Sequence, residues 1–281
     1  MKRTFLLTGA TFLLCLSLTV HAQENASDEN TTTTQTARSY MEEGQEEWEF
    51  MTSLTYETGD YGTSETTNTV YWPFTLKRYW ERADASFTIP LLYQETGPGV
   101  TAIGGRAFQT SRFTFGSEAT DSGIGDMLLK GRYYLFDETS QDFNLAAAGK
   151  IKFPTADDEE GLGTGEFDEG FGLEAGKTLN AFWSLYADIY YTFIGEPPGT
   201  DLDNEVAFNV GAGYNLTDET SASLFYQERT ALVDGRDNPR DIFLALNHEL
   251  NNTTDVFGGV SFGVSDGSPD FGVTAGTKYR F

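Results

Sequence analysis

The chain of 281 residues has a single cysteine, Cys15, which lies in an apolar run near the amino terminus. Two cysteines are needed for an internal disulfide, so none can stabilise this chain. Leu13 and Leu14 precede Cys15 where a lipoprotein signal would carry a small residue, so we also expect no lipid anchor. Stability must come from packing and main-chain hydrogen bonds.

Long hydrophobic runs are missing outside the first 22 residues. A basic start, an apolar stretch over residues 5–20 and a small-residue site at Val20-His21-Ala22 are typical of a cleaved signal peptide, which we predict over residues 1–22. The mean hydropathy of the chain is −0.37, and no other stretch has the ~20 apolar residues of a spanning helix. A helical membrane bundle is therefore excluded, whereas a β-barrel is not, because its strands alternate.

Basic residues are scarce, with 18 Lys and Arg against 43 Asp and Glu, and the net charge is −25. Nucleic-acid binding requires a basic surface, so we expect no such partner. The stretch 23–47 is polar and rich in carboxylates, and we predict a disordered acidic periplasmic tail there. Carboxylates also gather at Asp157-Asp158-Glu159-Glu160, which lacks the alternating ligands and glycine of a calcium loop.

Histidine is nearly absent, and His248 is the only one beyond the predicted signal peptide. A phospholipase-type outer-membrane hydrolase needs a serine and a histidine within hydrogen-bond reach. The alternation of its segment points His248 toward lipid, and the sequence around it lacks the serine and asparagine of such an enzyme. We therefore expect no enzymatic activity, no cofactor and no metal site, and a hydrolase is the least favoured alternative.

Alternating hydrophobicity is abundant, and the last eleven residues show it most clearly. From Phe271 to Phe281 every second residue is apolar or aromatic apart from Thr277, whereas glycine, threonine and cations occupy the other positions. This period of two predicts a strand with one lipid-facing and one lumen-facing side, ending on an aromatic residue. Phe281 resembles the terminal aromatic residue that the barrel-assembly machinery recognises.

Eleven further segments alternate in the same way, so twelve strands are predicted. They cover residues 48–56, 70–76, 83–93, 127–135, 143–153, 171–175, 183–193, 206–216, 222–226, 242–250, 256–264 and 271–281. Short connections mostly alternate with longer ones, as in outer-membrane barrels with short periplasmic turns. We therefore predict an all-β fold, an antiparallel up-and-down transmembrane β-barrel of about twelve strands, over residues 48–281.

Charged residues on the polar parity of these strands are candidates for the lumen lining. Nine of the thirteen are cations: Lys77, Arg82, Asp84, Lys130, Arg132, Lys150, Lys152, Glu174, Asp188, Arg229, Glu249, Lys278 and Arg280. Two interpretations remain open. The charges pair with one another across a narrow barrel, or a cationic lumen selects anionic solutes such as carboxylates or phenolates.

The connection between the third and fourth strands, residues 97–122, is unusually apolar for an exposed loop. It contains the possible constriction residues Arg106, Phe108, Arg112, Phe113 and Phe115. One hypothesis is that it folds into the barrel mouth and narrows the pore, and the other is that it packs on neighbouring loops or extends the strands.

Several short motifs occur in a fixed order between residues 122 and 193. They are Ser122-Gly-Ile-Gly-Asp126, Lys150-Ile-Lys-Phe-Pro-Thr155, an acidic loop, Leu162-Gly-Thr-Gly165, the strand from Phe171 to Lys177, and Trp183. In this respect the chain resembles the family named for the MetA pathway of phenol degradation. The resemblance implies an outer-membrane barrel that moves small aromatic or other hydrophobic compounds.

The sequence thus predicts an outer-membrane channel or facilitator for small molecules. The alternative is a structural or adhesive barrel with a packed lumen. Expected partners are outer-membrane lipid, lipopolysaccharide bridged to the acidic loops by divalent cations, a small-molecule solute, and the barrel-assembly machinery through Phe281.

Overall fold

The computed structural model describes residues 48–62, 65–96, 100–103, 106–109, 119–138 and 141–281. Across these residues every regular element is a strand, and no helix is long and apolar enough to cross a membrane. The strands are β1 (Trp48–Gly59), β2 (Thr67–Trp80), β3 (Ala83–Thr96), β4 (Val100–Ile103), β5 (Arg106–Gln109), β6 (Ala119–Ile124), β7 (Met127–Phe136), β8 (Asn144–Phe153), β9 (Asp168–Thr178), β10 (Trp183–Phe193), β11 (Glu205–Asn215), β12 (Thr220–Arg229), β13 (Arg240–Asn251), β14 (Thr254–Gly263) and β15 (Phe271–Arg280).

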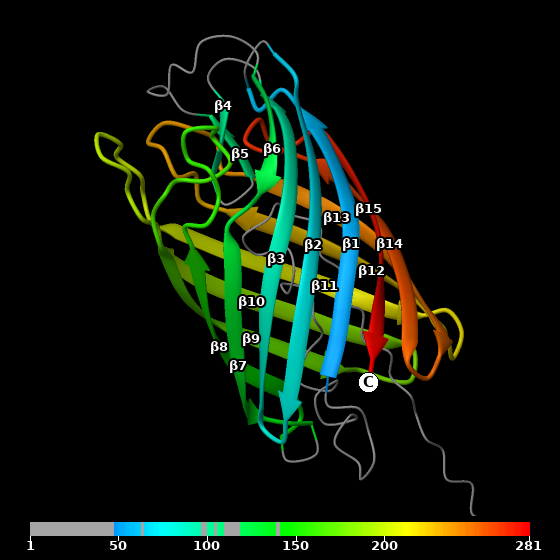
Figure 1. Cartoon of the computed structure of the whole chain (residues 1–281). Coiled ribbons are helices and arrows are strands. Elements are labelled where there is room, and N and C mark those ends of the chain that lie inside the picture. The colour runs from blue at the N-terminus through cyan, green and yellow to red at the C-terminus, as the bar shows by residue number, and fades with distance from the viewer. Residues whose placement is uncertain (1–47, 63–64, 97–99, 104–105, 110–118, 139–140) are drawn as a thin grey trace, which may run out of the picture.

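Antiparallel pairing between neighbours closes these strands into one barrel (Figure 1). The last strand, β15, pairs with β1 over ten residues, from Glu49 opposite Arg280 to Thr58 opposite Phe271. Trp48 and Phe281 extend the pairing, with an N–H···O bond in each direction of 3.1 and 2.9 Å. Closure satisfies the edges that lipid would leave without hydrogen-bond partners.

The barrel wall has twelve strands because β6 and β7 share one position in it. The extracellular half of β3 pairs with β6, and the other half pairs with β7. The interruption falls at Gly125 and Asp126, where the Gly125 N–H donates to the Pro90 carbonyl at 3.0 Å. A side chain at Gly125 would lie 3.1 Å from the Pro90 ring, so glycine suits this close approach.

The two faces of the wall are chemically distinct. Large apolar and aromatic side chains, such as Leu54, Trp72, Leu173 and Leu246, are exposed on the outside. Aromatic pairs occur near the strand ends, including Tyr279 stacked on Phe281 with centroids 5.9 Å apart. Polar and charged side chains are buried on the opposite parity. This is the arrangement of a barrel that faces lipid outside and a polar lumen inside.

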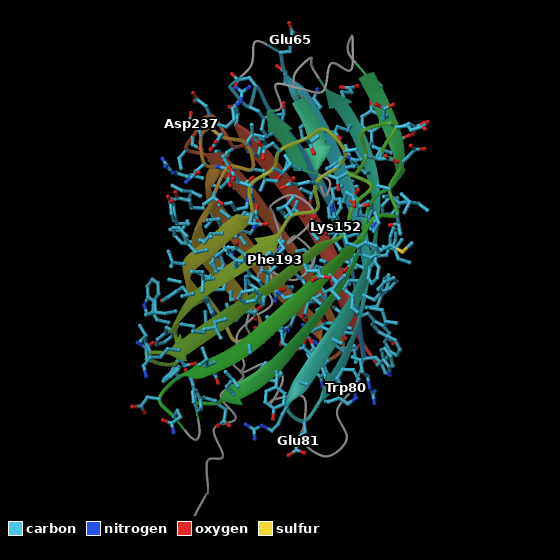
Figure 2. The ribbon with its side chains drawn as sticks, turned by 90° about the vertical axis from the view of Figure 1, so that its left-hand side faces the viewer. Glu65, Trp80, Glu81, Lys152, Phe193 and Asp237 are labelled. Atoms are coloured by element: carbon cyan, nitrogen blue, oxygen red, sulfur yellow. The ribbon has the colours of Figure 1, made fainter. Side chains whose placement is uncertain are left out.

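The two ends of the barrel also differ. Figure 2 shows Trp80 and Glu81 at the end with short turns, and Glu65 and Asp237 at the end with longer loops. The carboxyl terminus lies at the short-turn end, which is the periplasmic end of such barrels (Figure 1). Long loops connect β8 to β9, β10 to β11 and β12 to β13 at the opposite, extracellular end.

All twelve predicted segments coincide with strands of the wall, so the predicted fold class is confirmed. The stretch 97–122 holds more structure than a loop, since β4 and β5 form a hairpin and β6 extends the wall. Residues 1–47 lie outside the described part of the chain. The signal peptide and the acidic tail therefore stay predictions.

Glycines on the inner face allow aromatic rings to lie against the wall. A methyl group added at Gly259 would come within 2.6 Å of the Phe243 ring, and one at Gly211 within 2.5 Å of the Phe225 ring. Gly276 is covered in the same way by Phe257. The neighbouring Gly258 points outward, and its nearest atom would be the Thr274 carbonyl oxygen at 3.4 Å.

We predict that Gly259→Ala destabilises the barrel by about 1 to 3 kcal/mol, because Phe243 must leave its position. Gly258→Ala, one residue away on the lipid face, is the matched control and should change the stability by less than about 0.5 kcal/mol. Urea unfolding of the refolded barrel, followed by heat-modifiable mobility on gels, measures both. Equal stability of the two variants would show that the ring does not rest on Gly259.

Candidate functional site on the inner face of the barrel

A chain of buried ion pairs crosses one side of the inner face. Arg132 on β7 lies between two carboxylates, with its Nη2 2.9 Å from Asp84 on β3 and its Nη1 3.1 Å from Glu174 on β9. Lys77 on β2 approaches Asp84 at 3.6 Å, and Lys130 approaches Glu174 at 2.9 Å. The five charges, from four different strands, form one continuous network.

Small residues on the intervening strand make this network possible. Between β7 and β9 lies β8, where Ala148 is opposite Arg132 and Ala146 is opposite Glu174. Both are buried and short, so the Arg132 side chain can extend over β8 to reach Glu174. Two tyrosines complete the network, because the Tyr134 hydroxyl donates to Asp84 and the Tyr190 hydroxyl donates to Glu174. The carboxylates are thus held by hydrogen bonds as well as by charge.

A second cluster lies at the extracellular ends of β7, β8 and β9. Lys152 is 3.3 Å from Asp126 and 2.7 Å from Asp168, and it donates to the Thr164 hydroxyl at 3.1 Å. Asp126 also accepts the main-chain N–H groups of Thr155 and Ala156, each at 3.0 Å. The motif residues at 122–126, 150–155 and 162–165 therefore fasten the β8–β9 loop to the wall.

The periplasmic end of the lumen holds a third cluster around Arg280. This guanidinium lies 3.7 Å from Glu49 on β1 and donates to Asp255 on β14. Lys278, on the same strand, places its ammonium 5.7 Å from the centre of the Phe257 ring. The closing strand therefore links its neighbours through side chains as well as through main-chain bonds.

The structure places the thirteen predicted lumen charges as follows. Ten are buried on the inner face: Lys77, Asp84, Lys130, Arg132, Lys150, Lys152, Glu174, Arg229, Lys278 and Arg280. Asp188 and Glu249 share the inward parity and are half-buried. Arg82 differs, because β2 extends to Trp80 and β3 begins at Ala83, which leaves Arg82 exposed in the turn. There its guanidinium donates to the Tyr134 and Leu135 carbonyls at 3.3 Å.

The inner face is not as cationic as those thirteen residues suggested. Seven more carboxylates are buried on it: Glu49, Glu57, Asp126, Asp168, Glu205, Asp241 and Asp255. Strand parity alone could have found Glu49, Glu57, Asp241 and Asp255, which alternate with outward apolar residues. The other three lie where strands begin, at positions that sequence patterns place poorly. With these acids included, charge pairing describes the lumen better than anion selection.

An aromatic cluster on the opposite side of the lumen also escaped the sequence analysis. It consists of the buried residues Met51, Phe225, Phe243, Ala245 and Phe257, with Tyr186 packed against them. The rings of Tyr186 and Phe225 stack with centroids 5.8 Å apart. The only available signal was an aromatic residue on the polar parity of β12, β13 and β14. The ion-pair network thus faces an aromatic cluster across the lumen, and the Arg280 cluster lies next to these rings at the periplasmic end.

The possible constriction residues are only partly described. Arg106 and Phe108 belong to β5, where they pair with Ile103 and Thr101 of β4. Arg112, Phe113 and Phe115 lie outside the described residues. A narrowing of the mouth by this segment therefore stays a prediction.

We expect Arg132→Met to destabilise the barrel by about 3 kcal/mol, because two buried carboxylates lose their shared cation. Arg240→Met is the matched control, since Arg240 pairs with Glu228 at 3.2 Å but is 45% exposed, and its loss should cost less than about 1 kcal/mol. Equilibrium unfolding in urea compares the two. Equal losses would mean that the buried network contributes no more than a surface pair.

Solved outer-membrane proteins share this architecture at low sequence identity. The COG4313 outer membrane channel from Pseudomonas putida F1 is similar with a TM-score of 0.65 and 13% identity, over 86% of this chain and 98% of that one. The NanC porin is similar with a TM-score of 0.54 and 8% identity, over 83% of this chain and 100% of that one. The CymD monoaromatic hydrocarbon channel is similar with a TM-score of 0.50 and 6% identity, over 94% of this chain and 98% of that one. No curated protein sequence matches the chain.

A family model covers all of the described barrel. The family described as "Putative MetA-pathway of phenol degradation" matches residues 30–281. This match includes the motifs at residues 122–193 and the closing strand. The chain is an outer-membrane β-barrel that belongs to this family.

Proposed function

We propose that the protein is an outer-membrane channel or facilitator for small molecules, with a preference for solutes that have an apolar or aromatic part. The observation that carries the proposal is the two-sided inner face. One side holds buried ion pairs, and the other holds the aromatic cluster of Met51, Phe225, Phe243, Ala245 and Phe257. A solute with a ring and a polar group would find a partner for each part on this inner face.

Hydroxyl and amide side chains cover much of the remaining inner face. Ser53, Thr75, Asn209, Ser223 and Thr274 are buried there on five different strands. Each of these side chains can form hydrogen bonds with water or with the polar groups of a solute. The polar lining supports a route for hydrated solutes.

The glycine–aromatic contacts support the same proposal. Each ring that lies over a glycine stays close to the wall, so it occupies less of the barrel axis than a ring that points inward. Gly211, Gly259 and Gly276 perform this role for three phenylalanines of the cluster. The wall therefore offers aromatic contacts to a solute, and these three rings take up little of the space along the barrel axis.

Two alternatives compete with this function. A structural or adhesive barrel with a packed lumen would conduct nothing. A hydrolase would need a nucleophile beside His248, but this side chain is exposed on the outer face, where its Nδ1 lies 2.9 Å from the Thr220 hydroxyl. A threonine on the lipid side at a strand end makes a poor nucleophile site, and we propose that the protein is not an enzyme.

Two partners are also part of the proposal. Phe281 is exposed beside Tyr279, with its main chain paired to Trp48, and we propose that the barrel-assembly machinery recognises it. The acidic loops at the extracellular end suit divalent cations that bridge them to lipopolysaccharide phosphates.

The channel is tested by planar-bilayer conductance together with liposome uptake of phenylalanine, an aromatic solute that crosses lipid slowly. We expect discrete conductance steps and faster uptake than in empty liposomes. Ser223→Trp, which places a large ring in the lumen, should lower both several-fold. Leu224→Trp, on the lipid side of the same strand, should leave both unchanged. A folded wild-type barrel with neither conductance nor uptake would contradict the channel.

Deletion of Phe281 tests the proposed assembly signal. We expect at least a several-fold loss of heat-modifiable barrel in the outer membrane, while the protein is still exported to the periplasm. Phe271→Leu, which changes an aromatic residue at the other end of the same strand, is the control. Normal assembly after the deletion would show that Phe281 is not recognised.

A further inference from the structure

Apart from the connection at 97–122, the described extracellular loops carry a charge of almost one sign. The described loops at 60–62 and 65–66, 154–167, 194–204, 230–239 and 264–270 contain a single cation, Arg236. Their carboxylates are Asp60, Glu65, Asp157, Asp158, Glu159, Glu160, Glu166, Glu196, Asp201, Asp203, Asp234, Asp237, Asp266 and Asp270. So many like charges at one mouth create a negative potential that attracts cations and repels anions.

The excess of negative charge continues into the top of the lumen. Five buried carboxylates lie near the extracellular ends of the strands, namely Glu57, Asp126, Asp168, Glu205 and Asp241. Only two buried cations lie at this level among the described residues, Lys152 and Arg229. Lys152 pairs with Asp126 and Asp168, and Arg229 approaches Glu205 at 3.9 Å. A solute that enters from outside meets a net negative charge before it reaches the ion-pair network.

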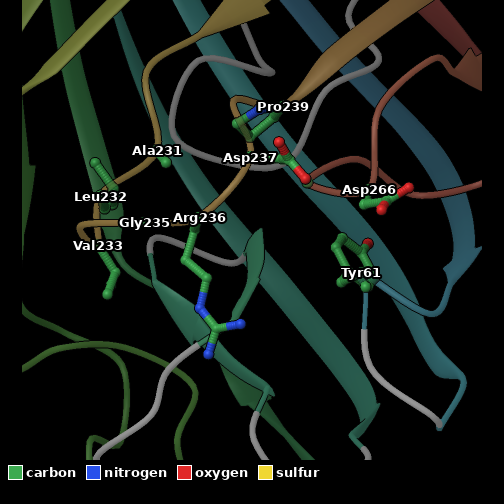
Figure 3. A pocket seen from close by; sticks show the side chains of 11 residues that line it. Tyr61, Ala231, Leu232, Val233, Gly235, Arg236, Asp237, Pro239 and Asp266 are labelled. Carbon is green, nitrogen blue, oxygen red and sulfur yellow. The ribbon is translucent and has the colours of Figure 1, made fainter.

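A cavity of about 180 Å³ lies within this acidic mouth, between three loops. Tyr61, Leu232 and Val233 line it, together with Arg236 and the carboxylates Asp237 and Asp266. Figure 3 shows Arg236 and Tyr61 on different sides of the cavity, with Asp237 and Asp266 on neighbouring loops. The space suits a molecule about the size of one substituted ring.

Hydrogen bonds fix the two larger loops around this cavity. The Ser265 hydroxyl donates to the Asn238 carbonyl at 2.7 Å, and the Arg240 N–H donates to the Ser268 hydroxyl at 2.6 Å. Within its own loop, Asn238 accepts the Ala231 N–H at 3.0 Å. These bonds hold the loops in place around the cavity, which lowers the entropic cost of binding a solute there.

Tyr61 joins the cavity to the inner face. Its backbone has a φ of 50°, a left-handed conformation that is unfavourable for a tyrosine, and its side chain is 3% exposed. Burial raises the pKa of its hydroxyl well above the usual value, and the nearby carboxylates Glu57 and Asp241 raise this pKa further. The neutral ring therefore borders both the cavity and the uppermost carboxylates of the lumen.

We propose that this cavity is an entry site for small organic cations, with the ring or alkyl part of the solute against Tyr61 and Leu232 and its ammonium group beside Asp237 and Asp266. The assignment rests on the proposed function, because it names the class of solute that the route admits. A carboxylate solute would be repelled by the acidic loops and would gain an attractive contact only with Arg236. An ammonium gains both carboxylates and is opposed only by Arg236.

Calorimetric titration of the detergent-solubilised full barrel with three probes of similar shape tests the proposal. The probes are benzylamine, benzyl alcohol and benzoate, titrated at low ionic strength with a chelator to remove divalent cations. We expect benzylamine to bind roughly tenfold more tightly than benzoate, with benzyl alcohol between them. The preference should fall to about twofold at 1 M salt, where the screening length is ~3 Å.

The variant Asp237→Asn/Asp266→Asn should reduce the preference for benzylamine over benzoate by roughly fivefold or more. Both carboxylates are exposed, so the barrel should fold normally, and heat-modifiable mobility checks this. The matched control is Asp142→Asn/Asp218→Asn, which removes two exposed carboxylates at the periplasmic end and should leave the preference unchanged. Glycine is compatible with the left-handed backbone at position 61, so Tyr61→Gly should weaken the binding of benzylamine and of benzyl alcohol to the same extent.

Three results would overturn the entry site. These are benzoate binding as tightly as benzylamine, a preference that survives the Asp237 and Asp266 substitutions, and no binding of any probe. The outcome separates from that of the channel. Benzylamine binding without conductance or uptake would contradict the channel and leave a cation-binding site that leads to no route. Conductance without a preference for benzylamine would support the channel and contradict the cation site.

Discussion

In the hydrocarbon core of a bilayer, each main-chain N–H or C=O group without a partner costs several kcal/mol. A sheet can avoid this cost only by closing on itself. Here β15 returns to β1, with ten paired residues and the added bonds between Trp48 and Phe281. The outer hydrophobic face and the inner polar face both depend on this closure.

Closure creates a second requirement inside the barrel. Polar side chains that alternate with lipid-facing ones must find partners within the lumen. Arg132 solves this by bridging Asp84 and Glu174 across a strand that carries only alanine beside it. On the opposite side, glycines receive the rings of Phe225, Phe243 and Phe257. The lumen is therefore divided into a charged side and an aromatic side, and this division supports the proposed function.

The sequence was sufficient for the architecture because parity is a local property. Each of the twelve strands alternates on its own, so the outward residues and the strand count could be predicted without long-range information. Buried inward charges such as Lys77 and Glu174 followed from the same parity. Arg82 did not, because a shift of one residue at a turn removes a side chain from the lumen, and strand ends are the least certain part of such a prediction.

The composition of the site was harder to predict than its fold. Lumen charge depends on how residues from many strands add up, and the carboxylates at strand starts, such as Asp168 and Glu205, show no alternation of their own. Phe225 and Phe243 are apolar residues on the inward side of their strands, where the pattern predicts polar ones. The glycines on the neighbouring strands, which make room for these rings, explain the exception. The cavity at Tyr61 is made by three separate loops, which no local pattern brings together.

The central claim is that the inner face lines a route for solutes, and cysteine labelling along β13 tests it most directly. The predicted mature chain has no cysteine, so single cysteines at Leu244, Ala245, Leu246 and Asn247 can be compared in intact outer membranes. A small cationic thiol reagent added from outside should modify cysteines at the inward positions 245 and 247, and should not modify those at the lipid-facing positions 244 and 246. Labelling at neither inward position would contradict the route and indicate a packed lumen.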